Sequence, residues 1–133
     1  MFLFDTDVLS NVLKRAPSPT LLGRLATLPA EQQFTTAITV GEIVYGAQRS
    51  SRRDYFLAQL EERVIGNMRV LQFDTSAARV YGRLRAELEQ RGTSVDMPDL
   101  MIAAIAMSRE MTVITGNVRH IAKVPGLMVD DWI

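Results

Sequence analysis

Short apolar runs that are typical of buried strands alternate with segments of helical periodicity along all 133 residues. This alternation favours a mainly parallel sheet with helices on both faces, because consecutive parallel strands must be joined by a crossover, usually a helix. We therefore expect one α/β domain over residues 1–133. The expected strands are residues 2–4, 34–37, 70–73, 112–115 and 127–129.

The clearest helical signal covers residues 76–91, where apolar side chains recur every three or four positions. Thr75 is the expected N-cap of this helix and Gly92 its C-terminal stop. Further helices are expected over residues 8–14, 21–28, 40–47 and 55–64, and from near Pro98 onward. In folds of this kind, functional sites gather where the strands end at their carboxyl edge.

The composition excludes several classes of protein. Cysteine is absent, so disulfides and thiolate chemistry are ruled out, and a reducing, cytoplasmic location is expected. No apolar stretch approaches the ~20 residues that span a bilayer. The apolar run after Met1 is too short, and lacks the basic flank, for a signal peptide.

The net charge is formally zero, with 15 basic and 15 acidic residues. All the basic residues except Lys14 and Lys123 are arginine, the side chain that binds phosphate through two parallel hydrogen bonds. If several acids converge on one site, the rest of the surface is net basic. A neutral total therefore does not exclude a polyanionic substrate.

Two acids, Asp5 and Asp7, follow the first expected strand with only Thr6 between them. One of them could cap the helix that is expected to begin at Val8, and Asp7 is placed for that role. A cap explains one carboxylate and leaves the other to bind a cation or a proton.

Glu42 is the only charged residue between residues 34 and 48. It lies opposite the apolar stripe of its helix, where the neighbours include Gly41, Tyr45 and Gly46. A solvent-facing glutamate is the simpler interpretation, but a solvent face usually carries several charges. We therefore expect this helix to be covered on both sides, which would bury a carboxylate that needs a cation or a proton.

Asp96 and Asp99 flank the expected start of the helix at Pro98. Acids in a first turn cap the helix and favour its dipole, and Asp96 is the expected cap. Asp99 lies inside that turn and could project into a cleft. Thr115 and Asn117 follow another strand, either as an ordinary Gly-Asn turn or as polar groups that face the acids.

A cluster of carboxylates cannot stay ionised without a counter-charge, so Mg²⁺ (or Mn²⁺) is the expected cofactor. Zinc is disfavoured, because His120 is the single histidine and is expected at the surface or on a phosphate. A bound metal lowers the pKa of water and neutralises phosphate charge, which favours hydrolysis of a phosphodiester. Arginines at the rim would hold the rest of the polymer, and the candidates are Arg49, Arg83 and Arg119.

Four segments resemble the motifs of PIN-domain ribonucleases in order and spacing, and the C-terminal VPGLMVDDW is similar to VapC-type toxins. The four segments are FLFDTDVLSNVLK, TTAITVGEIVYGA, PDLMIAAIA and TVITGN. The resemblance implies a PIN-like three-layer α/β/α sandwich and a Mg²⁺-dependent endoribonuclease that is the toxin of a type II toxin–antitoxin pair. It also implies a homodimer and a cognate antitoxin whose tail enters the active-site groove. Transfer RNA and ribosomal RNA both remain open as the substrate.

Carried over by motif, the resemblance makes Asp5, Glu42 and Asp99 the catalytic, metal-binding acids. Asn117 takes a fourth position where many relatives carry aspartate, which weakens the case for a second metal. The resemblance leaves lesser roles around the metal, in a second shell or at a second metal, for Asp7, Asp96 and Thr115.

Two alternatives stay open. The segment DTDVLS is similar to the opening of haloacid-dehalogenase-like phosphatases, which would make the chain another Mg²⁺-dependent phosphoryl-transfer enzyme. Such an enzyme needs a later lysine, for which Lys123 is the candidate. The other alternative is a PIN-fold binding module with weak or no catalysis, and Asn117 is the feature in its favour.

Overall fold

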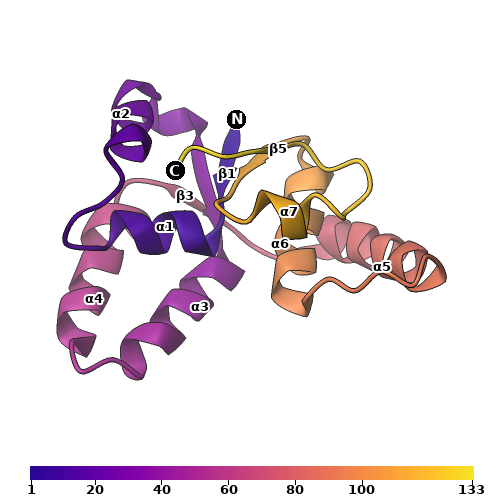
Figure 1. Ribbon diagram of the computed structural model, residues 1–133, viewed down its shortest axis with the longest axis horizontal. Helices are drawn as coiled ribbons and strands as arrows, with labels where there is room; N and C mark the ends of the chain where they lie inside the picture. Colours follow the sequence, from indigo (N-terminus) through magenta and orange to yellow (C-terminus); the bar gives the residue numbers. More distant parts are fainter.

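The computed structural model describes residues 1–133 and contains a five-stranded sheet in the order β3-β2-β1-β4-β5. All four pairs of neighbouring strands are parallel, which confirms the expected parallel sheet. The sheet runs through the middle of the molecule in Figure 1. The strands are β1 (Phe2–Phe4), β2 (Gln33–Thr36), β3 (Arg69–Leu71), β4 (Thr112–Ile114) and β5 (Val129–Asp130).

Helices cover both faces of the sheet, as expected for a three-layer α/β/α sandwich. One group lies to the left of the sheet in Figure 1 and comprises α1 (Thr6–Val12), α2 (Pro19–Thr27), α3 (Ala37–Gln48) and α4 (Arg53–Gln59). The other lies to the right and comprises α5 (Thr75–Gln90), α6 (Met97–Ser108) and α7 (Val118–Ile121). Short turns complete the chain, η1 (Ala30–Gln32) and η2 (Leu60–Ile65).

The central strand β1 contributes one side chain to each core, because successive residues of a strand point to opposite faces. Phe4 packs with Val8 and Ile43 in the core under α1 and α3. Leu3 packs with Ile102 in the core under α5 and α6. This packing fixes the end of β1, and therefore the residue that follows it.

The C-terminal residues are held against the sheet by Trp132. Its ring lies 5.1 Å from that of Phe2 and 5.5 Å from that of Phe4, measured between centroids. The indole N–H donates to Asp130 at 3.1 Å, and the Arg24 guanidinium lies 5.3 Å from the ring centroid.

Some element boundaries differ from the sequence expectation. Asp74, and not Thr75, is the N-cap of α5, and its carboxylate accepts from Ala77 N–H at 3.0 Å. The helix expected over residues 55–64 begins at Arg53 and widens into the π-helical turn η2 at Leu60. Helical periodicity in the sequence does not distinguish α from π geometry, so this change was not predictable. No helix has the length and apolar character that crossing a membrane requires.

Candidate active site

A cavity of about 480 Å³ opens at the carboxyl edge of the sheet. It contains Asp5 from the end of β1, Glu42 from α3 and Asp99 from α6. The complete lining is Asp5, Thr6, Asp7, Ser10, Lys14, Glu42, Asp99 and Asn117. The structure thus brings together the three acids expected at the site, together with Asp7 and Asn117.

Asp5 is the N-cap of α1, and its carboxylate accepts from Thr6 N–H at 2.6 Å. The residue is only 5% exposed. Burial raises the pKa of the Asp5 carboxyl to about 6, against the opposing hydrogen bond from Thr6 N–H and with further support from the negative charge of Asp7. Asp5 is therefore poised to take up either a cation or a proton.

Asp7 does not cap α1, so this expectation is wrong. It lies in the first turn of that helix, and its carboxylate reaches across to the segment after β4. It accepts from Gly116 N–H at 2.9 Å and from the Thr115 hydroxyl at 3.2 Å, and also from Val8 N–H at 2.8 Å. The Thr115 hydroxyl in turn accepts from Asn117 N–H at 3.0 Å. Asp7 and Thr115 thus fix the backbone that carries Asn117.

Glu42 is half-buried and accepts from the Thr6 hydroxyl at 2.6 Å. That hydroxyl is also 3.2 Å from the Thr39 hydroxyl, so α1 and α3 are joined beside the cavity. The expectation that α3 is covered on both sides is wrong, because Gly41 and Tyr45 are exposed. Glu42 is the only charged residue of α3, and it lies where the exposed face of this helix borders the cavity.

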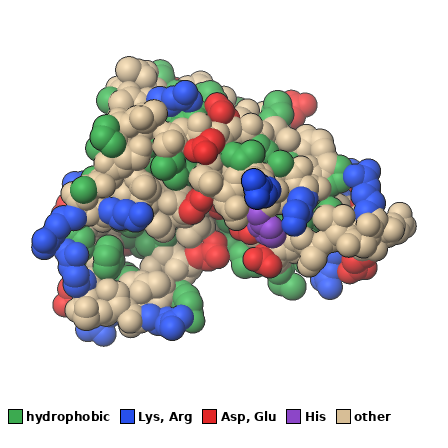
Figure 2. All heavy atoms as spheres, in the orientation of Figure 1, with side chains coloured by type: hydrophobic (Ala, Val, Ile, Leu, Met, Phe, Trp, Pro, Cys, Tyr) green, Lys and Arg blue, Asp and Glu red, His purple; other side chains and the backbone are tan.

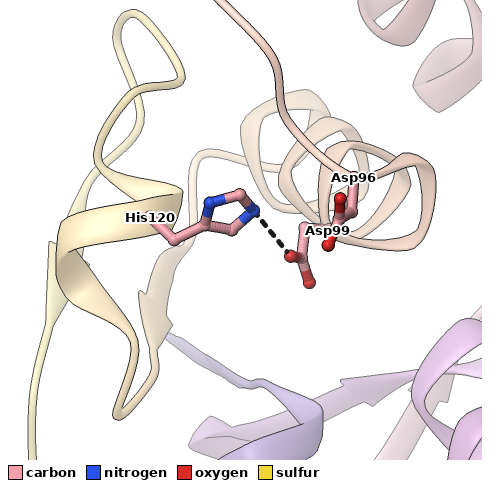
Figure 3. A group of neighbouring side chains, drawn as sticks. All are labelled: Asp96, Asp99 and His120. Atoms are coloured by element: carbon pink, nitrogen blue, oxygen red, sulfur yellow. Dashed lines mark ion pairs between the residues drawn. The ribbon is translucent and has the colours of Figure 1, made fainter.

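Asp99 lies in the first turn of α6 and is half-buried. Burial raises the pKa of its carboxyl, and the charges of Glu42, Asp96 and Asp7 act in the same direction, whereas His120 opposes them. Nε2 of His120 lies 3.1 Å from Oδ2 of Asp99, as Figure 3 shows. Asp96 is the N-cap residue of α6, as expected, but its side chain makes no capping hydrogen bond.

Sequence reasoning missed three residues of this region. Ser10 lines the cavity because it lies one turn beyond Asp7 on the same face of α1, a spacing that was available as a signal. Lys14 also lines the cavity, from the bend that follows the end of α1 at Val12. His120 was expected at the surface but is half-buried against Asp99. Its position three residues after Asn117 was the available sign, since α7 begins directly after the segment that carries Asn117.

The expected RNA-binding arginines do not line the cavity. Arg49, Arg83 and Arg119 are exposed, and Arg49 stacks on Tyr45 with its guanidinium 5.4 Å from the ring centroid. Figure 2 shows acidic side chains along the middle of one face, with basic side chains on either side of them. Lys123 is also exposed and does not line the cavity, which removes the support for the phosphatase alternative.

The donor set of the cavity fits a hard divalent cation. Its four carboxylates outnumber the single ammonium group of Lys14, and neither cysteine nor histidine lines it. The raised pKa values of Asp5 and Asp99 reflect a repulsion and a desolvation that a bound cation would relieve. Oxygen ligands of this kind are those that Mg²⁺ and Mn²⁺ prefer.

Comparison with known proteins gives matches along nearly the whole chain. The PIN domain matches residues 2–127. A tRNA(fMet)-specific endonuclease VapC from Salmonella typhimurium is 35% identical over 98% of this chain and 97% of its own length. Its counterpart from Shigella flexneri is 32% identical over the same shares.

Solved structures agree with these matches. A crystal structure of DNA-bound VapBC from Salmonella typhimurium superimposes with a TM-score of 0.92 at 35% identity, covering 99% of this chain and 98% of the other. FitAcB from Neisseria gonorrhoeae gives a TM-score of 0.87 at 27% identity, covering 97% and 96%. From the family match, the relatives and the shared fold, we conclude that this chain belongs to the PIN domain family and is a homologue of VapC ribonucleases.

Proposed function

We propose that this protein is a Mg²⁺-dependent endoribonuclease that acts as the toxin of a toxin–antitoxin pair. The observation that carries the proposal is the meeting of Asp5, Glu42 and Asp99, which are far apart in the sequence, around one cavity. Ribonuclease activity in the VapC relatives supports the choice of reaction.

Asp5, Glu42 and Asp99 would hold the cation through their carboxylate oxygens. When bound, a divalent cation supplies water of lowered pKa and neutralises the charge that develops on the phosphate oxygens. The chain's own part is to position these acids. The Thr6 hydroxyl orients Glu42, and Thr6 N–H orients Asp5. Asp7 and Thr115 hold the backbone at Asn117, which lines the cavity as a neutral polar residue.

Lys14 is the one basic side chain in the cavity lining, and we assign it to a phosphate of the RNA next to the cleaved bond. The arginines Arg49, Arg83 and Arg119 are exposed, and we assign them to more distant phosphates of the RNA. A positive rim around an acidic centre guides a polyanion to the site while the centre is neutralised by the cation.

We propose transfer RNA as the substrate class. Two relatives that cover 98% of this chain at 35% and 32% identity are specific for tRNA(fMet). Ribosomal RNA is the other class expected from the sequence, and mapping of cleavage sites on total RNA distinguishes the two.

We also propose a cognate antitoxin as the partner, because structural relatives of this chain occur in VapBC complexes. An apolar groove lined by Leu13, Ile43 and Phe56 adjoins the cavity at Ser10 and Glu42 and could receive a segment of that partner. The homodimer stays a prediction, which sedimentation of the purified protein tests.

The test is cleavage of total RNA by protein freed of any partner, in the presence of Mg²⁺. We expect Asp5→Asn, Glu42→Gln and Asp99→Asn each to lose at least about 100-fold in rate, as loss of a charge-stabilising group at an active site does. Asp54→Asn is the matched control, since its side chain is 93% exposed and does not line the cavity. Activity that survives in the three variants would refute the proposal.

The binding-module alternative makes a different prediction for the same experiment. If Asn117 has ended catalysis, the unaltered protein does not cleave RNA with either Mg²⁺ or Mn²⁺. Restoration of cleavage by Asn117→Asp would then assign the loss to that position.

A further inference from the structure

A second group of possible metal ligands lies next to the all-oxygen cavity. Asp96, Asp99 and His120 each offer one ligand atom, and these three atoms lie within 4.8 Å of one another. Figure 3 shows His120 reaching from α7 toward the start of α6, where the two carboxylates lie. This group differs from the cavity in its chemistry, because it contains the only imidazole of the chain.

The imidazole nitrogen is placed as a ligand would be. Nε2 of His120 is buried and has no hydrogen-bond partner, although Oδ2 of Asp99 is 3.1 Å away. The contact is therefore close without being an aligned hydrogen bond. Two ligands of a tetrahedral ion with bonds of about 2.1 Å are about 3.4 Å apart, so the observed separation is near the one that a shared metal requires.

The third ligand is free to complete the site. The Asp96 side chain is exposed and takes part in no hydrogen bond or salt bridge, although it occupies the N-cap position where one is usual. Solvent can supply the remaining ligands, since His120 and Asp99 have side chains that are about one-quarter exposed.

We propose that Asp96, Asp99 and His120 bind a divalent transition-metal ion such as Zn²⁺ beside the proposed Mg²⁺ site. Mixed nitrogen and oxygen ligands favour Zn²⁺, and Mn²⁺ more weakly, whereas Mg²⁺ takes oxygen ligands. Asp99 belongs to both groups, so the two sites share one carboxylate. This inference concerns metal binding and does not depend on RNA cleavage by the protein.

The single histidine makes a direct test possible. In ¹⁵N-labelled protein without a histidine tag, every imidazole nitrogen signal belongs to His120. We expect Zn²⁺ to shift the Nε2 resonance strongly, and Mg²⁺, which acts on His120 only through the shared Asp99, to shift it much less. An Nε2 resonance that does not respond to Zn²⁺, or that responds equally to Mg²⁺, would overturn the proposal.

Calorimetric titration with Zn²⁺ in excess Mg²⁺ assigns the other ligands. We expect His120→Gln to weaken Zn²⁺ binding at least about 100-fold, which is more than the loss of a side chain that only supports a metal ligand usually causes. We expect Asp96→Asn to weaken Zn²⁺ binding at least about tenfold. The exposed control Asp54→Asn should keep the site. Because Asp96 is exposed, its substitution removes no core packing. Unchanged Zn²⁺ affinity in Asp96→Asn would refute the three-residue site.

Discussion

Replacement of Asp5 by asparagine should make the metal-free protein more stable at neutral pH. The Asp5 carboxyl is buried, and burial raises its pKa from 3.8 to about 6. Asparagine keeps a side-chain oxygen that can accept the hydrogen bond from Thr6 N–H, and it carries no charge to desolvate. The substitution therefore removes the charge while retaining the cap of α1.

The sign and size of the effect follow from linkage. Below pH 3.8 the carboxyl is protonated in both the folded and the unfolded state. As the pH rises toward 6 the unfolded state loses its proton first, so the free energy of unfolding decreases. Above about pH 7 the loss levels off at about 3 kcal/mol, since each unit of pKa difference corresponds to about 1.4 kcal/mol. Roughly half of this loss falls between about pH 5 and about pH 7.5.

The measurement is urea denaturation in a metal chelator at a series of pH values. The difference in unfolding free energy between Asp5→Asn and the unaltered protein should grow by about 1.4 kcal/mol from pH 5 to pH 7.5. The exposed control Asp54→Asn should show no such growth. A constant difference across this range would show that Asp5 has an ordinary pKa, and the electrostatic account of the cavity would be wrong.

Four further predictions concern stability. Addition of Mg²⁺ should raise the melting temperature of the unaltered protein but not that of Asp5→Asn. A ligand that binds only the folded state stabilises it by about 2.7 kcal/mol at 100 times its Kd. Equal shifts in the two proteins would show that the cation binds elsewhere. Gly116→Ala would put a Cβ 2.9 Å from Oδ2 of Asp7, so we expect a loss of about 1–2 kcal/mol in urea denaturation. Gly82→Ala, in the exposed middle of α5 with nothing within 4 Å, should instead gain about 0.5–1 kcal/mol. Trp132→Ala should lower the free energy of unfolding by about 3–5 kcal/mol, because it removes a large buried side chain, and circular dichroism follows the unfolding. A smaller loss would show that the C-terminal residues are dispensable for stability.

The elements and the layers of the fold were predictable from the sequence because they depend on local periodicity. The runs at Phe2–Phe4 and around residue 113 are apolar on both faces, as strands covered on both sides must be. What the sequence did not show were features that depend on tertiary contacts. Asp74 and Thr75 are equally suitable N-cap residues by type, and only the path of the chain into α5 decides between them.

The site was predictable to a similar extent. Asp5, Glu42 and Asp99 stood out because each is an acid in a mostly apolar stretch, and the structure places all three at one cavity. The partner of Asp7 was not predictable, because Gly116 is 109 positions away and its N–H carries no sequence signal. His120 could be placed near the site from its position three residues after Asn117, but its contact with Asp99 depends on the packing of α7 beside α6 and carries no sequence signal.

The topology explains why the three acids meet. Asp5 follows the central strand β1, and α3, which carries Glu42, begins directly after the neighbouring strand β2. Helix α6 leads back to the start of β4, so its first turn, with Asp99, lies at the edge where that strand ends. The cavity therefore lies at the N-terminal ends of α1 and α6, where backbone N–H groups favour negative charge, and beside the middle of α3, which carries Glu42.

These helix ends do not remove the cost of gathering the acids. If they did, the carboxyls would titrate at or below their ordinary pKa, yet the pKa of both Asp5 and Asp99 is raised. Burial and mutual repulsion thus outweigh the hydrogen bonds and helix dipoles that the chain supplies. The fold concentrates more negative charge than it can neutralise, and this deficit is what makes a divalent cation the expected occupant of the cavity.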